Sequence, residues 1–74
     1  MAGTRIVFVW RIVIHHIADE NGNRKILTYE KEDDARSRFE EFRDYWGTGR
    51  NGNGHTYKLV HPTSNLVAES FDSQ

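Results

Sequence analysis

The sequence lacks cysteine and has only one proline and one methionine among its 74 residues. Without cysteine, neither a disulfide nor a metal site built from thiolates can support the fold. A chain this short buries only about two-thirds of the surface that its unfolded form exposes, so its own hydrophobic core is small. We therefore expect one domain over residues 1–74, with flexible ends at residues 1–3 and 72–74, that gains stability from self-association.

The sequence also lacks an excess of charge of one sign and any long apolar run. Ten basic and eleven acidic residues leave a formal net charge of -1, which gives no general attraction to nucleic acid or to an anionic membrane. The most apolar stretch, residues 5–17, contains Arg11 and two histidines, which excludes a membrane-spanning helix or a signal-peptide core. We expect a cytoplasmic protein without a membrane partner.

Residues 5–17 are the clearest structural signal in the chain. They consist mainly of β-branched and aromatic residues, without glycine or proline, and predict one strand of about twice the ordinary length. Asn21 and Gly22 then predict a two-residue hairpin turn of type I′. With that turn, Ile17 faces Ile26, and the second strand covers residues 24–30.

A helix is predicted over residues 32–46. Four apolar residues fall on one stripe at spacings of four, three and four: Ala35, Phe39, Phe42 and Trp46. Acidic residues 32–34 suit the positive end of the helix dipole, and Gly47 can adopt the left-handed conformation that ends many helices. The helix therefore presents one apolar stripe to a sheet.

The remaining segments complete an α+β fold. A glycine-rich loop at 47–54 leads to a third strand at 55–61, a turn at 62–65 and a fourth strand at 66–71. The element order ββαββ predicts a four-stranded antiparallel sheet with one helix on one face. The simplest antiparallel arrangement has the strand order 2-1-3-4.

The two faces of the first strand have different roles in this fold. Alternation places Ile6, Phe8, Trp10, Ile12 and Ile14 on the face that receives the helix. The other face carries Val7, Val9, Arg11, Val13, His15 and Ile17.

One helix cannot cover both faces of the sheet. Either the second face tolerates valine for its β-propensity or a partner covers it, and we favour a partner. The first strand is also longer than the second, so its N-terminal half lacks a pairing strand within the chain. We therefore expect a homodimer, and the candidate binding residues are Arg5, Val7, Val9, Arg11, Val13 and His15.

The residue types of the glycine-rich loop match a nucleotide-binding pattern, but their position in the fold does not. Residues 47–52 read G-x-G-x-x-G, but the dinucleotide fingerprint opens a helix, whereas this segment follows one. The nearby carbonyl end of the helix repels phosphate. We expect a simple loop, in which Arg50 is a candidate contact for an anionic partner.

The sequence has no recognisable catalytic or metal-binding pattern. His15 and His16 are neighbours on a strand and point to opposite faces, so they cannot chelate one ion; His16 could meet His61 only if the strand order allows it. There is no cysteine nucleophile, no serine in an elbow context and no His-Glu helical pair. We predict neither a cofactor nor catalysis.

In general composition the chain is similar to the short accessory proteins common in phage genomes, a likeness that involves no specific motif and implies a protein that acts by binding. Our first hypothesis is a non-catalytic, homo-oligomeric binding module that binds a protein partner or a small anionic ligand at the subunit interface. A nucleic-acid-binding or DNA-mimicking protein is the alternative from another class, and a small metal-dependent enzyme is a third. Phosphate binding would weaken steeply with salt, which separates the second hypothesis from the first.

Overall fold

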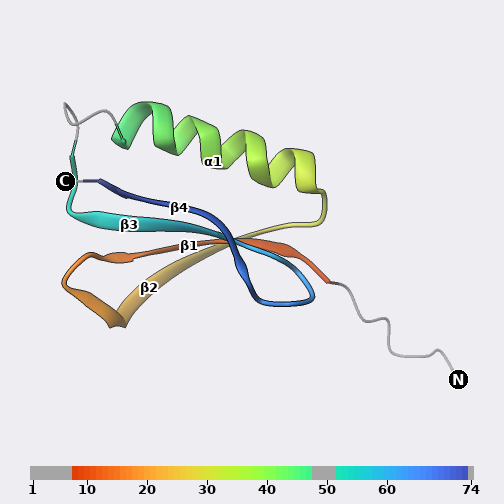
Figure 1. Ribbon diagram of the computed structural model, residues 1–74, viewed down its shortest axis with the longest axis horizontal. Coiled ribbons are helices and arrows are strands. Elements are labelled where there is room, and N and C mark those ends of the chain that lie inside the picture. The colour runs from red at the N-terminus through yellow and green to blue at the C-terminus, as the bar shows by residue number, and fades with distance from the viewer. Residues whose placement is uncertain (1–7, 48–51, 74) are drawn as a thin grey trace, which may run out of the picture.

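A computed structural model describes residues 8–47 and 52–73 of the protein and confirms the predicted fold class (Figure 1). The elements are β1 (Trp10–His16), β2 (Asp19–Tyr29), α1 (Glu32–Trp46), β3 (His55–Val60) and β4 (Val67–Ser73). The strand order is β2-β1-β3-β4, as expected, and neighbouring strands are antiparallel. Within the described residues, no helix is long and apolar enough to cross a membrane.

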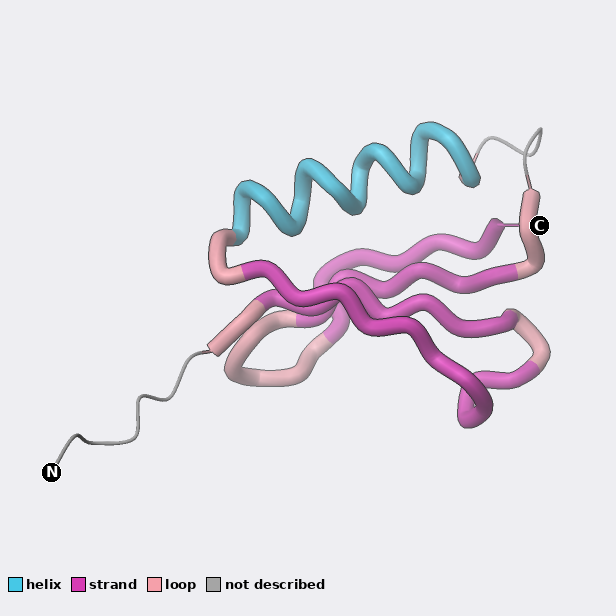
Figure 2. The backbone as a smooth tube through the Cα atoms, turned by 180° about the vertical axis from the view of Figure 1, so that it is seen from behind, coloured by secondary structure: helices cyan, strands magenta, loops and turns pink. Residues whose placement is uncertain are grey.

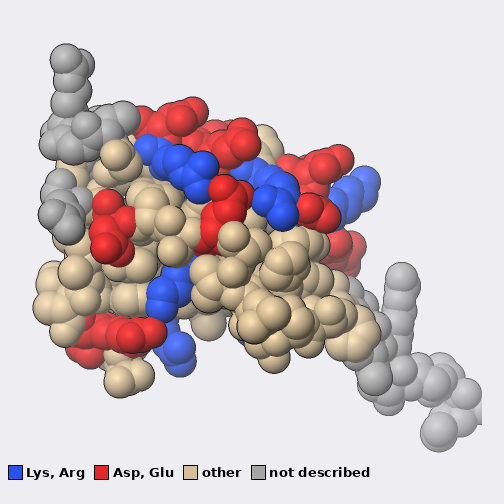
Figure 3. Space-filling view, in the orientation of Figure 1, with Lys and Arg blue, Asp and Glu red and all other residues tan. Residues whose placement is uncertain are grey.

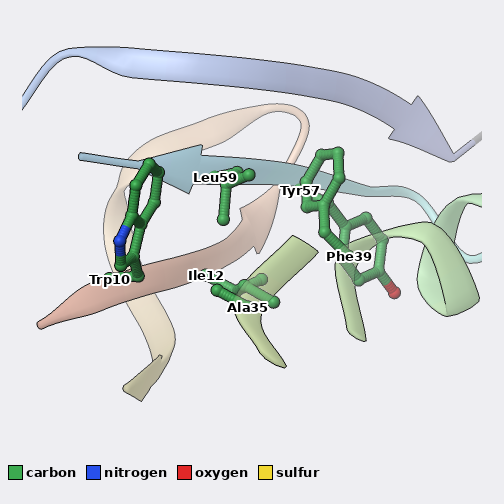
Figure 4. Close-up of a cluster of buried hydrophobic side chains, with 6 residues drawn as sticks. All are labelled: Trp10, Ile12, Ala35, Phe39, Tyr57 and Leu59. Carbon is green, nitrogen blue, oxygen red and sulfur yellow. The ribbon is translucent and has the colours of Figure 1, made fainter. Parts of the chain in front are cut away.

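The helix packs on one face of the sheet and leaves the other face bare in the described part of the chain (Figures 1 and 2). The core lies between α1 and the two central strands (Figure 4). Phe39 of α1, Ile12 of β1 and Leu59 of β3 are all 0% exposed. The ring of Tyr57 stacks on that of Phe71 with centroids 4.7 Å apart, which closes the core toward β4.

Ion pairs fasten the helix to the edge strand β4. Arg36 and Arg43 lie two turns apart on α1, and both contact the Glu69 carboxylate, at 2.9 and 2.8 Å. Hydrogen bonding from Arg43, together with both positive charges, lowers the pKa of Glu69, although burial opposes this shift. The carboxylate therefore stays charged to a lower pH than an ordinary glutamate and holds the helix over the sheet.

The helix ends differently from the prediction. Gly47 has φ -90° and ψ 0°, which is right-handed rather than left-handed, and its N–H donates to the Arg43 carbonyl at 2.8 Å. A Cβ atom at this position would lie 2.6 Å from that carbonyl oxygen, too close for any other residue without a shift. Glycine is therefore required here for space and not for a positive φ.

The prediction of one long strand over residues 5–17 is wrong for the described residues, because β1 is shorter at both ends. β1 begins at Trp10, so Phe8 and Val9 precede it, and Ile17 belongs to a turn; residues 5–7 lie outside the described residues. Phe8 is 59% exposed and does not belong to the hydrophobic core. β2 has eleven residues against seven in β1, which removes the overhang as support for a dimer. Both edges of β1 are occupied, by β2 and β3.

The hairpin turn also differs from the prediction. Positive φ occurs only at Asn65 and Gly54 in the described part of the chain, so Asn21 and Gly22 do not form a type I′ turn. The chain instead reverses at residues 17–18, and His16 pairs with Asp19.

One contact distant in sequence and one local contact hold this turn. The Ile17 N–H donates to the Gly54 carbonyl at 2.9 Å, and the Ala18 N–H donates to the His16 imidazole at 3.1 Å. Ile26 consequently faces Val13 instead of Ile17, a shift of four residues. Because the shift is even, each side chain stays on its predicted face of the sheet.

In the second hairpin, β3 is one residue shorter than predicted and β4 lies closer to the C-terminus. β3 ends at Val60, one residue before the predicted end, and β4 continues through Asp72 and Ser73, which the sequence had assigned to a flexible tail. The Ser73 hydroxyl donates to the Trp46 carbonyl at 2.6 Å, and the Gly54 N–H donates to the Ser73 carbonyl at 2.7 Å. These bonds tie the end of β4 to the end of the helix.

Phe39→Ala tests the contact between helix and sheet. Removing a fully buried ring leaves a cavity in the only core of the described domain, and we expect a loss of about 3–5 kcal/mol in the free energy of unfolding. Urea denaturation measures it. Phe8→Ala is the matched control, because Phe8 is exposed and its truncation should change stability by no more than about 0.5 kcal/mol. Equal losses in both variants would contradict this description of the core.

Candidate binding surface

The face of the sheet opposite α1 is built from three rows of cross-strand neighbours. Alternation along each strand and the observed register define these rows. From one end of the sheet to the other they are Thr28, Arg11, Val60 and Val67; then Ile26, Val13, Lys58 and Ser70; then Arg24, His15, Thr56 and Asp72. We call this surface the open face.

The apolar residues of the open face differ in exposure. Val60 is 7% exposed, and Val13 is half-buried between its cross-strand neighbours. Ile26 on β2 and Val67 on β4 are 50% and 49% exposed, and the adjacent Leu66 is 66% exposed. In Figure 3, uncharged atoms gather at the end where β3 joins β4, whereas carboxylates gather over α1.

An ion pair lies over the centre of the open face. Lys58 Nζ lies 2.9 Å from Glu20 Oε1, which links β3 to the irregular start of β2. A hydrogen bond from Lys58, its charge and the charge of His15 lower the pKa of the Glu20 carboxyl. Glu20 therefore remains ionised at a lower pH than an ordinary glutamate.

His15 is buried although it belongs to the open face. It is 4% exposed, and its Nδ1 lies 2.9 Å from the His16 carbonyl oxygen, so in the neutral ring Nδ1–H donates to that oxygen. Its Nε2 is then an acceptor, and it has no hydrogen-bond partner among the described residues. The His15 side chain therefore lies beneath the exposed atoms of the open face.

A charged side chain at each end of the open face is hydrogen-bonded to neutral groups. Arg11 donates to the Asn65 side-chain oxygen and, at 3.4 Å, to the His61 carbonyl. At the opposite end, Asp72 accepts a hydrogen bond from the Thr56 hydroxyl at 2.7 Å. Neither Arg11 nor Asp72 forms an ion pair within residues 8–47 and 52–73.

The predicted site residues are only partly brought together. Arg11 and Val13 lie side by side on the open face, and Val9 precedes β1 and is half-buried. His15 lies on this face but below its surface. The remaining three, Arg5, Val7 and Arg50, lie outside the described residues.

Sequence reasoning missed several members of the surface. The alternation along the predicted third strand already separates Lys58 and Val60 from the core residues, and the strand order then places them beside β1. Nothing in the sequence identifies Glu20 as a partner of Lys58, from which it is 38 positions away. Asn65 was expected only as a turn residue, and its contact with Arg11 spans 54 positions.

The histidines do not form a metal site. His16 lies beside His55, with ring centroids 5.8 Å apart, because the antiparallel register joins the end of β1 to the start of β3. His61 instead packs on Trp10 with ring centroids 4.7 Å apart. The His16 Nδ1 accepts the Ala18 N–H, which leaves the proton of the neutral ring on Nε2, where it opposes metal binding. No group of three metal-ligating side chains occurs among the described residues.

These features define a small α+β domain with one uncovered, partly apolar sheet face. Comparison of the chain with protein-family models, with curated proteins and with solved structures found no match.

Lys58→Met tests the ion pair over the open face. In the native protein we expect a Glu20 pKa below the ordinary range, and the substitution should raise it because it removes the largest cause of the lowering. Carboxyl NMR titration of Glu20 measures this shift. Since the folded pKa is the lower one, the stabilisation by this pair is present above the unfolded pKa and is lost as pH falls through the folded pKa. Lys25→Met is the control, and an equal effect there would refute the assignment.

Proposed function

We propose that this protein is a non-catalytic binding module that works as a homo-oligomer and binds a protein partner through its open face. The observation that carries the proposal is the one-sided cover of the sheet: α1 packs on one face, while the other presents Val13, Ile26 and Val67 with no covering element in the described residues. Val13 and Ile26 are cross-strand neighbours, and Val67 lies beside Val60 at the other edge, so the apolar side chains form two pairs on one sheet face, which favours an interaction surface.

The flatness of the open face favours a protein over a small ligand. Small-molecule sites are concave and enclose most of their ligand. No pocket was found in the part of the chain that the structure describes. A broad surface with apolar residues, two arginines and a polar margin resembles a protein-protein interface, in which arginine is enriched.

The charges indicate the chemistry of the partner. Arg11 lies beside Val13 and Val60 and donates hydrogen bonds to neutral oxygens only. It can therefore bind the carboxylate of a partner without losing an existing ion pair. Charge-assisted hydrogen bonds from arginine to a carboxylate are among the strongest polar contacts at interfaces. We infer an apolar partner surface that carries an acidic side chain opposite Arg11.

Nucleic acid fits the open face less well. Single strands are bound by aromatic rings that stack on bases next to basic groups. Arg11, Arg24 and Lys58 supply positive charge, but the three rows contain no aromatic residue, and the rings of Phe39 and Tyr57 are buried under the helix. A DNA mimic would use the acidic outer face of α1, where ion pairs from Arg36 to Glu32 and from Arg38 to Glu41 reduce the negative charge.

Site-specific photo-crosslinking tests the proposal. Because the chain has no cysteine, Val67→Cys places a single photoreactive label on the open face, and Ser37→Cys places the same label on the outer side of α1. In an extract of the cells that make the protein, we expect the Val67 label to form a discrete product with a different protein. Labelling at Ser37 should not give this product.

Competition makes the result specific. Unlabelled native protein should suppress the product at saturating concentration, and unlabelled Val67→Arg should need at least about tenfold more, because it places a charge in the apolar contact. Unlabelled Ser37→Arg should compete as the native protein does. Identical products from both labels, or equal competition by both arginine variants, would exclude the open face as the recognition surface.

A further inference from the structure

The outer edge of β2 is the longest unpaired strand edge in the described part of the chain. The strand order places β2 and β4 at the two edges, with eleven and seven residues. From Arg24 to Tyr29, β2 pairs with β1 in continuous register. The irregular part of β2 precedes Arg24. Every second backbone N–H and C=O of this segment points away from β1 and must bind water or another strand.

We propose that two copies of the chain pair through these edges, antiparallel and centred on Leu27, which joins two sheets into one of eight strands. This inference rests on the proposed homo-oligomer and names the place where its subunits meet. With Leu27 facing the partner's Leu27, Lys25 faces the partner's Tyr29, and Ile26 faces the partner's Thr28. Arg24 then lies opposite the partner's Glu30, and the two-fold axis forms this pair twice.

The charges along β2 select this register. Arg24 and Glu30 are both exposed, and neither forms an ion pair within residues 8–47 and 52–73. Opposite charges directly across an antiparallel pair stabilise it, and like charges destabilise it. A shift of the register by two residues in one direction places Lys25 opposite the partner's Lys31. A shift in the other direction places Lys25 opposite the partner's Leu27, and both shifts lose the two ion pairs.

The other edge of the sheet is unsuitable for self-pairing. β4 carries Glu69 and Asp72 and has no basic residue, so two copies would bring acids together without a counter-charge. Glu69 is also engaged by Arg36 and Arg43 of the helix. Charged residues on an edge strand commonly prevent pairing, but Arg24 of β2 and Glu30, which directly follows β2, are of opposite charge and lie opposite each other across the proposed two-fold axis.

The register keeps both helices on one side of the joined sheet. Facing residues are both even or both odd in number, so they point to the same side. The two open faces then form one continuous surface, with Ile26 and Thr28 of each copy at the seam. Each copy contributes Arg11 and Val13 to this surface, so the proposed partner surface becomes about twice as wide.

Solution mass and a charge swap test the inference on the full chain. Sedimentation equilibrium should give two chains of 8.7 kDa each. Arg24→Glu alone and Glu30→Arg alone should each weaken the dimer at least about tenfold, because both pairs then carry like charges. The double variant Arg24→Glu with Glu30→Arg should restore the native dimer, since it reverses both pairs. Arg38→Glu on the outer face of α1 is the control for a change in net charge.

Disulfide trapping provides a second measurement. Only Leu27 faces its own copy, so mild oxidation of Leu27→Cys should give a covalent dimer, whereas Val67→Cys on β4 should stay monomeric. A dimer that neither single reversal weakens, or that the double variant does not restore, overturns the β2 pairing but leaves the homo-oligomer intact. A single-chain mass at every concentration overturns both, and the crosslinking at Val67 then tests the open face independently.

Discussion

The packing of one amphipathic helix on a four-stranded sheet is the constraint on which the rest of the structure depends. Phe39 and Ala35 of α1 pack with Ile12 and Leu59, which face each other on the two inner strands. A helix of fifteen residues is about 22 Å long and about 10 Å wide, enough to cover one face of this small sheet. No second helix in the described part of the chain covers the opposite face.

The polar groups of the open face are arranged to satisfy one another. Lys58 pairs with Glu20, Thr56 binds Asp72, and Arg11 is held by Asn65 and a backbone carbonyl. These contacts satisfy the polar groups of a surface that is exposed to water. The exposed valine and isoleucine side chains lie between them. Such a mixed surface is typical of partners that exist apart and associate reversibly, whereas obligate interfaces are more apolar.

The element order and the faces of the strands could be predicted from the sequence because they depend on local periodicity, whereas the strand order was predicted as the simplest all-antiparallel arrangement. The alternation in β1 and β3 and the apolar stripe of α1 are visible in the residues themselves. The hairpin register was wrong because its turn is fixed by the Gly54 carbonyl and the His16 ring, which bind Ile17 and Ala18. Periodicity cannot show a bond to a residue more than thirty positions away.

The same limit applies to the candidate site. Arg11 and Val13 were found from alternation alone, but alternation along a strand does not reveal that His15 is buried on this face. Likewise, Asp72 and Ser73 have the composition of a tail and become part of β4 through bonds to Thr56, Trp46 and Gly54. Polar residues in short segments are placed by such tertiary contacts, whereas apolar residues are placed by their spacing.

Edge pairing and the open face are thermodynamically connected if both proposals hold. A β2 edge contributes main-chain hydrogen bonds and two exposed ion pairs, which are individually weak, and it buries little apolar surface. Such a dimer should dissociate readily. A partner that spans the seam contacts both copies, binds the dimer better than the monomer, and therefore strengthens the pairing by the same factor by which pairing strengthens its own binding. Partner binding and dimer formation through the β2 edge would then be coupled, so that each one favours the other.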